Sequence, residues 1–269
     1  MPSKVAIVTG GASGIGRAIC KELVQQNVFV IISDINEQAG RNLEEELNNA
    51  TIKSRYVYLD VTKYESVEKI LTDIYQEFGR IDYLFNNAGI AMYGELYDLT
   101  IENWKEIMDV NLWGVINGTQ VGYKIMKKQG FGHIVNTSSA AGLGPSPGST
   151  AYATTKHAVV GLTTSLHYEA EQFGIKVSTL CPTFVDTPIF EEAKAINTDK
   201  TVIIKQLKKQ KMMSPEKLAK IALRGIHGNK PIICPMPMRR TMDIFFTLFP
   251  IAHKGLMRLV CKVSREARI

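Results

Sequence analysis

A tyrosine and a lysine four residues apart are the pair in this chain best suited to acid–base chemistry. Tyr152 and Lys156 lie in a segment of helical composition, residues 151–172, so both side chains leave one face of one helix. A free tyrosine titrates near ~10, too high for a base at neutral pH. A positive charge about 4 Å away contributes roughly 4 kcal/mol at an effective dielectric of about 20, equivalent to about three pKa units. Lys156 could therefore make Tyr152 a general acid and base.

Ser139 supplies a hydroxyl that could join this pair. It follows residues 133–137, an apolar run typical of a buried strand, and a loop rich in glycine and proline separates it from Tyr152. This loop allows the hydroxyl to meet the helix face that carries the phenol. A tyrosine and a lysine at this spacing usually have no joint function, so their interpretation depends on the rest of the chain.

A glycine-rich turn near the N-terminus is typical of a phosphate-binding loop. The sequence Thr9-Gly-Gly-Ala-Ser-Gly-Ile-Gly16 follows an apolar strand and enters a helical segment, residues 15–26. The free N–H groups and the dipole of a helix N-terminus favour a pyrophosphate, and missing side chains let it approach. The spacing differs from the more common Gly-x-Gly-x-x-Gly fingerprint. The residues expected to contact a dinucleotide here are Gly10, Ser13, Gly14, Ile15 and Gly16.

These motifs, together with Asn86-Asn-Ala-Gly89, resemble the short-chain dehydrogenase/reductase family from about Lys4 to Thr187. The resemblance implies a nicotinamide cofactor and a catalytic set of Asn111, Ser139, Tyr152 and Lys156, with Asn111 holding a water that relays protons to the lysine. A satisfied core amide is the alternative for Asn111. Further cofactor contacts implied by the resemblance are Asp60, Val61, the backbone near Asn87, Tyr152, Lys156, Val185 and Thr187.

Asp34 predicts a preference for NAD over NADP. It ends the second strand, where a carboxylate can accept hydrogen bonds from the adenosine ribose and would repel a 2′-phosphate. Ala12 and Ser13 bring no basic side chain to the glycine turn, which also favours NAD. The alternative is that Asp34 caps the helix that begins after it. Asp60 could likewise be only the cap of the helix that starts at Thr62.

One position departs from the family pattern. Thr183 replaces a glycine that usually follows the proline after the sixth strand, so a Cβ lies where none is expected beside the nicotinamide. Thr187, four residues further on, still matches the pattern and could hydrogen-bond the carboxamide.

Alternating strand and helix patterns predict an α/β fold, a doubly wound, seven-stranded parallel sheet with helices on both faces. A dinucleotide binds such a sheet beyond the carboxyl ends of its strands. We expect one dinucleotide-binding and catalytic domain over residues 1–237, with residues 188–213 as a substrate lid, and a basic, apolar C-terminal extension over 238–269. The expected strands are residues 4–8, 29–33, 55–59, 83–86, 133–137, 176–180 and 231–234.

Composition narrows the classes of partner. The chain has 269 residues, 45% of them hydrophobic, and a net charge of +6, but no nucleic-acid-binding motif accompanies that charge. Four widely spaced cysteines indicate neither a zinc site nor a disulfide framework, and we expect no metal. The first strand begins directly after Lys4 with no signal segment, so we expect a cytoplasmic protein. A homodimer or homotetramer is expected.

The leading hypothesis is therefore an NAD-dependent short-chain alcohol dehydrogenase or carbonyl reductase acting on a small apolar alcohol or ketone. The alternative within the same chemistry is a 3-oxoacyl-carrier-protein reductase, although Asp34 argues against the NADP preference of that group. A non-catalytic nucleotide-binding sensor is the alternative of another class, and such sensors commonly lose the catalytic residues. A sugar-nucleotide epimerase or dehydratase would generally carry a larger C-terminal domain.

The C-terminal extension interleaves apolar and basic residues. The uncharged run of residues 244–252 is well under the roughly 20 residues that span a bilayer, so a transmembrane anchor is not expected. Lys254, Arg258, Lys262 and Arg265 recur along one helical face, opposite much of the apolar surface, which is typical of a helix lying on an anionic membrane. A cover over the substrate cleft or a subunit interface is an equally good interpretation. Either one implies an apolar substrate.

Overall fold

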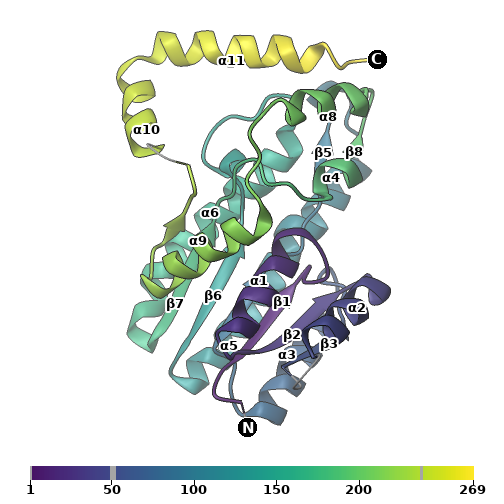
Figure 1. Ribbon diagram of the computed structural model, residues 1–269. Helices are drawn as coiled ribbons and strands as arrows, with labels where there is room; N and C mark the ends of the chain where they lie inside the picture. The colour runs from purple at the N-terminus through teal and green to yellow at the C-terminus, as the bar shows by residue number, and fades with distance from the viewer. Residues whose placement is uncertain (1, 49–52, 237–238) are drawn as a thin grey trace.

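Seven parallel strands form the centre of the molecule (Figure 1). The structure, a computed structural model, describes residues 2–48, 53–236 and 239–269. The strands lie in the order β3-β2-β1-β4-β6-β7-β9, and every neighbouring pair is parallel. Their bounds are β1 Val5–Thr9, β2 Phe29–Asp34, β3 Ser54–Tyr58, β4 Tyr83–Asn86, β6 Gly132–Thr137, β7 Ile175–Leu180 and β9 Ile232–Ile233.

The predicted fold class is confirmed, and each of the seven expected strands is present with ends that shift by at most a residue or two. Two further strands, β5 (Met92–Tyr93) and β8 (Lys194–Ala195), were not expected. They pair in parallel as a separate two-stranded sheet. A strand of two residues is too short for an alternating pattern to reveal it.

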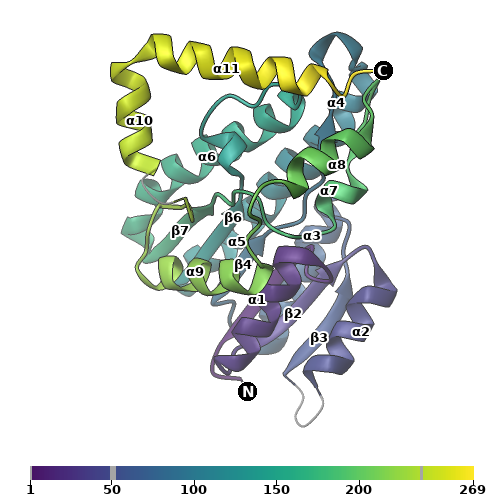
Figure 2. The same cartoon turned by 45° about the horizontal axis from the view of Figure 1, so that its top comes forward.

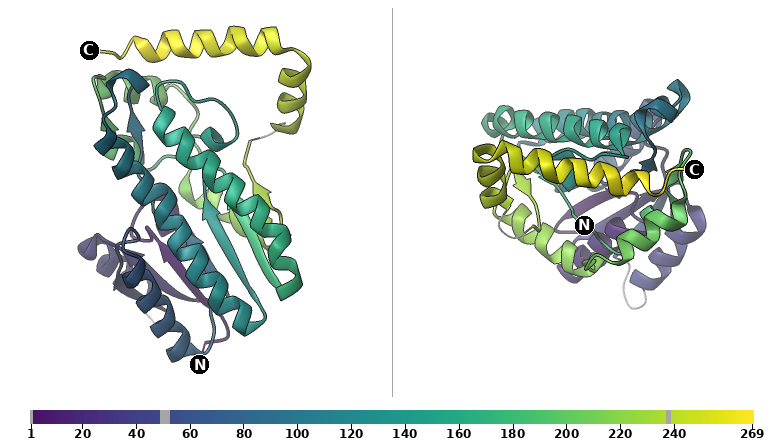
Figure 3. Two further views of the ribbon diagram at one scale, coloured as in Figure 1. Left: turned by 180° about the vertical axis from the view of Figure 1, so that it is seen from behind. Right: turned by 90° about the horizontal axis from the view of Figure 1, so that it is seen from above.

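Alternation along the strands divides the apolar side chains between two cores. In β1, Ala6 and Val8 face one core while Val5 and Ile7 face the other, and all four are completely buried. Helices α1, α2 and α9 cover the first core, and α3, α5 and α6 cover the second, which gives the three layers seen from above in Figure 3. The bounds are α1 Gly14–Gln25, α2 Glu37–Leu47, α3 Tyr64–Phe78, α5 Gly114–Gln129, α6 Thr150–Ala170 and α9 Pro215–His227.

The helical segment before α5 contains an irregularity. A helix α4 (Ile101–Met108) continues through a π-helical turn, Asp109–Trp113, directly into α5. A π turn widens the helix by one residue and is often found at functional sites. Asn111 lies within this turn and is completely buried.

The region expected as a lid is built from short elements: α7 (Ile189–Glu192), β8 and α8 (Lys200–Lys208). Pairing of β8 with β5 joins it to the loop that follows β4. After β9 the chain forms α10 (Arg239–Leu248) and α11 (Pro250–Arg265). All views place α11 beyond the carboxyl ends of the strands, across the upper end of the molecule in Figures 1 and 2.

No helix in the described ranges is long and apolar enough to cross a bilayer. The same ranges contain no group of three or more His, Cys, Asp or Glu side chains that could hold a metal ion.

The start of β1 depends on one buried carboxylate. Asp82 accepts a hydrogen bond from the Val5 N–H at 2.8 Å and is held by two hydrogen bonds from Arg80. We predict that Asp82→Ala lowers the free energy of unfolding by about 2 kcal/mol, because a buried N–H loses its partner. Asp73→Ala, which removes only an exposed pair with Lys69, should cost less than about 0.5 kcal/mol. Urea unfolding of both variants measures this, and equal losses would contradict it.

Candidate active site

The expected site residues gather at one edge of the sheet, where the carboxyl ends of the strands meet (Figure 2). The order of the sheet reverses between β1 and β4, which are neighbours with crossovers leading away on opposite sides. Gly10 directly follows β1, and Asn87 directly follows β4. Dinucleotides bind doubly wound sheets at such a switch point.

The glycines of the turn after β1 are needed for two different reasons. Gly10 and Gly14 have φ angles of 61° and 50°, in the left-handed region that side chains disfavour. Gly16 is needed for close packing, since a Cβ there would lie 2.0 Å from the carbonyl oxygen of Gly10. A substitution at any of these positions would change the path of the turn.

The N-terminus of α1 fits an anionic group. Ser13 is the N-cap but makes no capping hydrogen bond with its side chain, and the first turn contains no acidic residue. The first N–H groups of a helix have no partner within the helix, and the dipole there favours negative charge. Thr187 lies opposite, with side-chain carbons 3.2 Å from the place that a Cβ on Gly14 would occupy. A dinucleotide pyrophosphate therefore suits this end of the helix, with Ile15 part of the same turn.

Asn87 ties the glycine turn to the sheet. Its side chain donates hydrogen bonds to the carbonyl oxygens of Thr9 and Gly10, and its Oδ1 accepts one from the Thr137 hydroxyl. Its own N–H donates to the Thr9 hydroxyl. The amide thus has a structural role and leaves the backbone near Asn87 to line a cofactor.

The Asp34 carboxylate also contacts the glycine turn. One oxygen accepts a hydrogen bond from the Ala12 N–H at 3.0 Å and the other from the Asn36 N–H at 2.9 Å. The alternative that Asp34 caps the following helix is wrong, because Asn36 is the N-cap of α2 and its side chain accepts from the Ala39 N–H. Asp34 therefore lies where the turn and the end of β2 meet.

Asp60 and Val61 are engaged in local contacts. Asp60 Oδ1 accepts hydrogen bonds from the N–H and the hydroxyl of Thr62, so it stabilises the turn before α3. It is not the cap of that helix, whose N-cap is Lys63. Val61 is buried, and its carbonyl oxygen accepts a hydrogen bond from the Asn117 side chain.

The structure brings Ser139, Tyr152 and Lys156 together. The Ser139 hydroxyl lies close enough to the Tyr152 phenol to affect its pKa, and Lys156 Nζ lies 5.5 Å from the centroid of the tyrosine ring. The lysine is only 3% exposed and donates a hydrogen bond to the Thr137 carbonyl oxygen at 3.1 Å. A hydroxyl, a phenol and an amine thus converge where β6 ends and α6 begins.

Burial shifts both titratable groups toward their neutral forms. It lowers the pKa of Lys156 from 10.5 to about 8. Burial also raises the pKa of Tyr152, and the nearby Ser139 hydroxyl, which favours the ionised phenol, only partly opposes this rise. The lowering of the tyrosine pKa that we expected from Lys156 is not found, since burial is the largest effect and the ammonium is not among the groups that shift the phenol. Tyr152 is therefore a neutral phenol at pH 7.

Asn111 has the contacts of a satisfied core amide. Its Oδ1 accepts from the Ile90 N–H, and its Nδ2 donates to the Ile90 carbonyl oxygen and to the Thr155 hydroxyl. A Cβ on Gly89 would lie 3.1 Å from Asn111 Oδ1 and 3.4 Å from Lys156 Nζ, so both polar groups border the same glycine. The relay of protons to Lys156 stays a prediction.

The segment after β7 contributes mainly backbone. The Val185 side chain is buried in a core, and its carbonyl oxygen accepts a hydrogen bond from the Thr187 hydroxyl at 3.4 Å. Thr183 does not have a positive φ, so its backbone adopts a conformation that any residue can take. The Cβ at Thr183 therefore causes no strain in the chain path.

Three side chains near the site were not singled out from the sequence. Ser138 donates a hydrogen bond to the Lys156 carbonyl oxygen at 2.7 Å and so fixes α6 to the end of β6. The Thr9 hydroxyl accepts hydrogen bonds from the N–H groups of Asn87 and Ala88. Tyr93, in β5, has its pKa raised by burial and by the nearby Tyr152. Ser138 and Thr9 could have been identified from the sequence, because each carries a hydroxyl at the end of an expected strand. Tyr93 could not, because it lies in β5, a strand that was not expected.

Comparison with known proteins agrees with this geometry. Residues 4–197 match the model of a family described as short chain dehydrogenase. The chain is 34% identical over 223 residues to the 3-oxoacyl-[acyl-carrier-protein] reductase FabG of Thermotoga maritima, which covers 83% of this chain and 90% of that protein. It is 38% identical over 186 residues to the 3-alpha-(or 20-beta)-hydroxysteroid dehydrogenase of Mycobacterium tuberculosis, with 69% and 70% covered.

A solved structure shows the same likeness. The short chain dehydrogenase/reductase of Burkholderia phymatum in complex with NAD superimposes with a TM-score of 0.82 at 29% identity, over 90% of this chain and 92% of that one.

The buried lysine yields a prediction about stability and pH. Between about pH 8 and 10.5 the unfolded chain binds a proton on Lys156 that the folded chain does not, so this residue makes stability rise with pH in that window. Below about pH 8 the cost of burying the ammonium is fully present. We predict that Lys156→Met is more stable than the parent at pH 7, by on the order of 1–3 kcal/mol, and that this difference shrinks toward pH 10.5.

Urea unfolding across this pH range is the measurement, with the exposed Lys220→Met as the matched control. A difference between Lys156→Met and the parent that does not change with pH would contradict the shifted pKa.

Proposed function

Because this chain belongs to the short-chain dehydrogenase family, and is thus an oxidoreductase with a nicotinamide cofactor, we propose that it transfers hydride between NAD and an apolar secondary alcohol or ketone. The single observation that carries the proposal is the convergence of Ser139 and Lys156 on Tyr152, at the sheet edge that also holds the anion-binding turn. Each group has a separate task in the reaction.

Tyr152 acts on the proton of the substrate oxygen. The bound nicotinamide supplies or accepts the hydride. In carbonyl reduction the neutral phenol donates its proton to the developing alkoxide, and the raised pKa of Tyr152 keeps that proton in place at pH 7. Ser139 holds the substrate oxygen by a hydrogen bond. Lys156 would hold ribose hydroxyls of the cofactor and, through Asn111 and water, exchange protons with the solvent.

The surroundings of Tyr152 support an apolar substrate. Its ring packs against a small apolar cluster that includes Met92, Ile107 and, from the lid, Ile196. Tyr93 adds a second aromatic ring close to the phenol. A charged or strongly hydrated substrate would lose its water here without new partners, whereas an apolar alcohol or ketone would not.

Preference for NAD is supported by charge at the ribose end. The Asp34 carboxylate lies beside the glycine turn, where it would repel a 2′-phosphate. The arginines of α1 and α2 are already engaged, Arg17 by Glu46 and Arg41 by Glu37. A 2′-phosphate would therefore meet a carboxylate without a free guanidinium to neutralise it.

A 3-oxoacyl-carrier-protein reductase is the second candidate, favoured by the similarity to the Thermotoga maritima enzyme. Assays of secondary alcohols and ketones, with an acyl-carrier-linked substrate beside them, separate the two. A non-catalytic sensor is disfavoured because Ser139, Tyr152 and Lys156 are all retained. The homodimer or homotetramer stays a prediction.

We predict that Tyr152→Phe lowers kcat at least about 100-fold, because only the group that moves the proton is removed. The Kd for NADH should change less than about threefold, since the ring and the rest of the pocket remain. Tyr168→Phe is a matched control on the exposed face of the same helix and should leave both values unchanged. Turnover of Tyr152→Phe within about tenfold of the parent would refute the tyrosine as acid and base.

A second prediction concerns the cofactor. The parent should bind NADH at least about tenfold more tightly than NADPH, a difference of about 1.4 kcal/mol or more. Asp34→Ala and Asp34→Asn should both shrink this ratio, and the asparagine variant keeps an oxygen to accept the Ala12 N–H while losing the charge. Fluorescence titration with the two reduced cofactors measures the ratio. A parent protein that prefers NADPH would show that Asp34 does not select the cofactor.

A further inference from the structure

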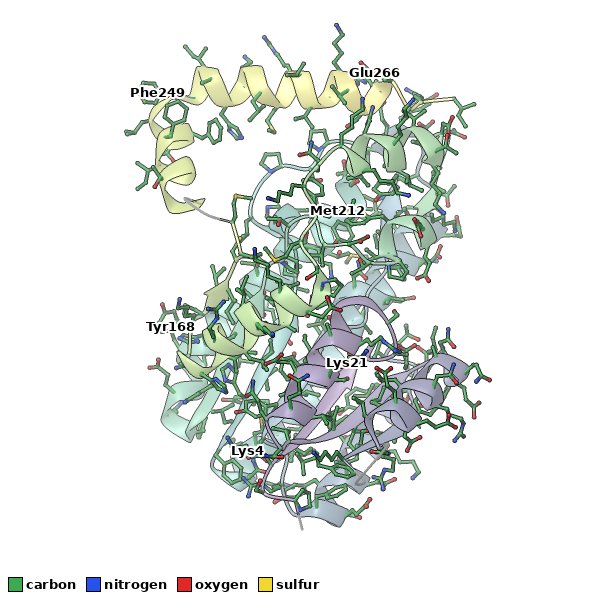
Figure 4. All side chains as sticks on the ribbon, viewed as in Figure 1. Lys4, Lys21, Tyr168, Met212, Phe249 and Glu266 are labelled. Atoms are coloured by element: carbon green, nitrogen blue, oxygen red, sulfur yellow. The ribbon has the colours of Figure 1, made fainter. Side chains whose placement is uncertain are left out.

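The last two helices form an exposed layer at the upper end of the molecule. Phe249 and Glu266, labelled in Figure 4, mark the two ends of α11. Of the eighteen large apolar side chains that are exposed among the described residues, nine lie within residues 244–269. Half of these exposed apolar side chains therefore lie in this short C-terminal segment, which contains the second half of α10 and all of α11.

Three of the exposed apolar side chains of α11 lie on one face. Leu256, Leu259 and Val263 are spaced by three and four residues and are 40%, 57% and 37% exposed. At the bend between the helices, the ring of Phe249 lies 4.8 Å from that of Phe245, and both side chains are exposed. Water-facing apolar residues in such number require an apolar partner.

A basic face lies on the side of α11 opposite much of this apolar face. Lys254, Arg258 and Lys262 are exposed and follow one another at intervals of four residues, so like charges are neighbours. Residues 250–265 contain no acidic side chain, and no ion pair within the described part of the chain engages these three residues. A surface groove of about 480 Å³ runs along this face, lined by Lys254, Met257, Arg258, Cys261, Lys262 and Arg265.

We propose that this surface docks on an anionic lipid membrane. Lipid head groups supply the negative charge that the basic face lacks, and acyl chains supply the apolar phase for the leucine and phenylalanine side chains. A second copy of the chain fits less well. A two-fold contact through α11 would bring together two helices that each carry a net positive charge, with no carboxylate on either helix to neutralise it.

The membrane surface would also adjoin the candidate active site, a point that rests on the proposed function. Arg265 and Arg268 both contact Glu95, two residues after Tyr93, and the Asp199 N–H of the lid donates a hydrogen bond to the Ala267 carbonyl oxygen at 2.6 Å. The Ser264 hydroxyl donates one to the Pro147 carbonyl oxygen, in the loop between Ser139 and Tyr152. The end of α11 thus contacts three segments near the candidate site, so lipid-soluble alcohols or ketones are the substrate class that this placement favours.

Co-sedimentation of the full chain with vesicles tests the docking and needs neither cofactor nor substrate, so its failure is distinct from a failure of the proposed function. Vesicles with about one third phosphatidylserine should bind at least about tenfold more tightly than pure phosphatidylcholine. The difference should be lost between about 0.01 M and about 1 M salt, as the Debye length falls from about 30 to about 3 Å.

Reversing the charge of three basic residues tests whether α11 is the part of the chain that binds the vesicles. The variant Lys254→Glu, Arg258→Glu, Lys262→Glu should bind anionic vesicles about 100-fold more weakly. The matched control Lys128→Glu, Lys176→Glu, Lys220→Glu has the same net charge, with its three changes at exposed positions outside α10 and α11, and should bind within about threefold of the parent. Circular dichroism and NADH titration should show the same fold for both variants.

Three results would overturn the proposal. They are no binding of the parent to anionic vesicles, equal binding to neutral vesicles, and equal losses in the two triple variants. A dimer that Leu259→Asp dissociates, found without vesicle binding, would assign the surface to a second copy instead.

Discussion

Parallel pairing of the seven central strands is the constraint on which the site depends. It places every carboxyl end at one edge, so residues far apart in sequence, such as Gly10, Asp34 and Ser139, lie at or just after the ends of strands on the same edge. The edge is not held by the sheet alone. Asn87 hydrogen-bonds the glycine turn after β1 and also accepts from Thr137 at the end of β6, so side chains fix these loops relative to one another.

The cost of burial decides the electrostatics of the site. Lys156 is buried and Tyr152 is partly buried, and the pKa of each moves toward the neutral form, down for the amine and up for the phenol. The ammonium keeps one hydrogen bond, to the Thr137 carbonyl oxygen, and Ser138 holds the same residue by its backbone. The position of Lys156 is therefore secured by hydrogen bonds with uncharged groups, while the burial of its charge lowers the stability of the fold.

The sequence predicted the fold well because long segments record their burial and their secondary structure. The continuous apolar run of β1, which is buried at every position, and the long helical segment of α6 could both be recognised. Features that depend on single residues or on contacts distant in sequence could not be predicted. The π turn around Asn111 preserves a helical pattern, so the segment resembles one continuous helix, and β5 contains only two residues.

The sequence identified which residue types form the site, but it did not predict the environment that surrounds each of them. Spacing identified Tyr152 and Lys156, but the direction of the tyrosine pKa depends on burial, which three-dimensional packing decides. The N-cap of α2 also depends on neighbouring residues, and it is Asn36 and not Asp34. Asp34 instead accepts a hydrogen bond from the Ala12 N–H across the edge of the sheet. Only the neighbouring strand brings that donor within reach.

Attachment of α11 to the body combines weak and strong interactions. The pairs of Arg265 and Arg268 with Glu95 are exposed, and such pairs contribute about 0–1 kcal/mol. Ala267 is 1% exposed, and two backbone hydrogen bonds beside it, from the Asp199 N–H to the Ala267 carbonyl oxygen and from the Ile269 N–H to the Asn197 carbonyl oxygen, do not depend on salt in this way. In the proposed docking, salt therefore screens the exposed basic face of α11 without acting on the backbone hydrogen bonds that join its end to residues 197 and 199.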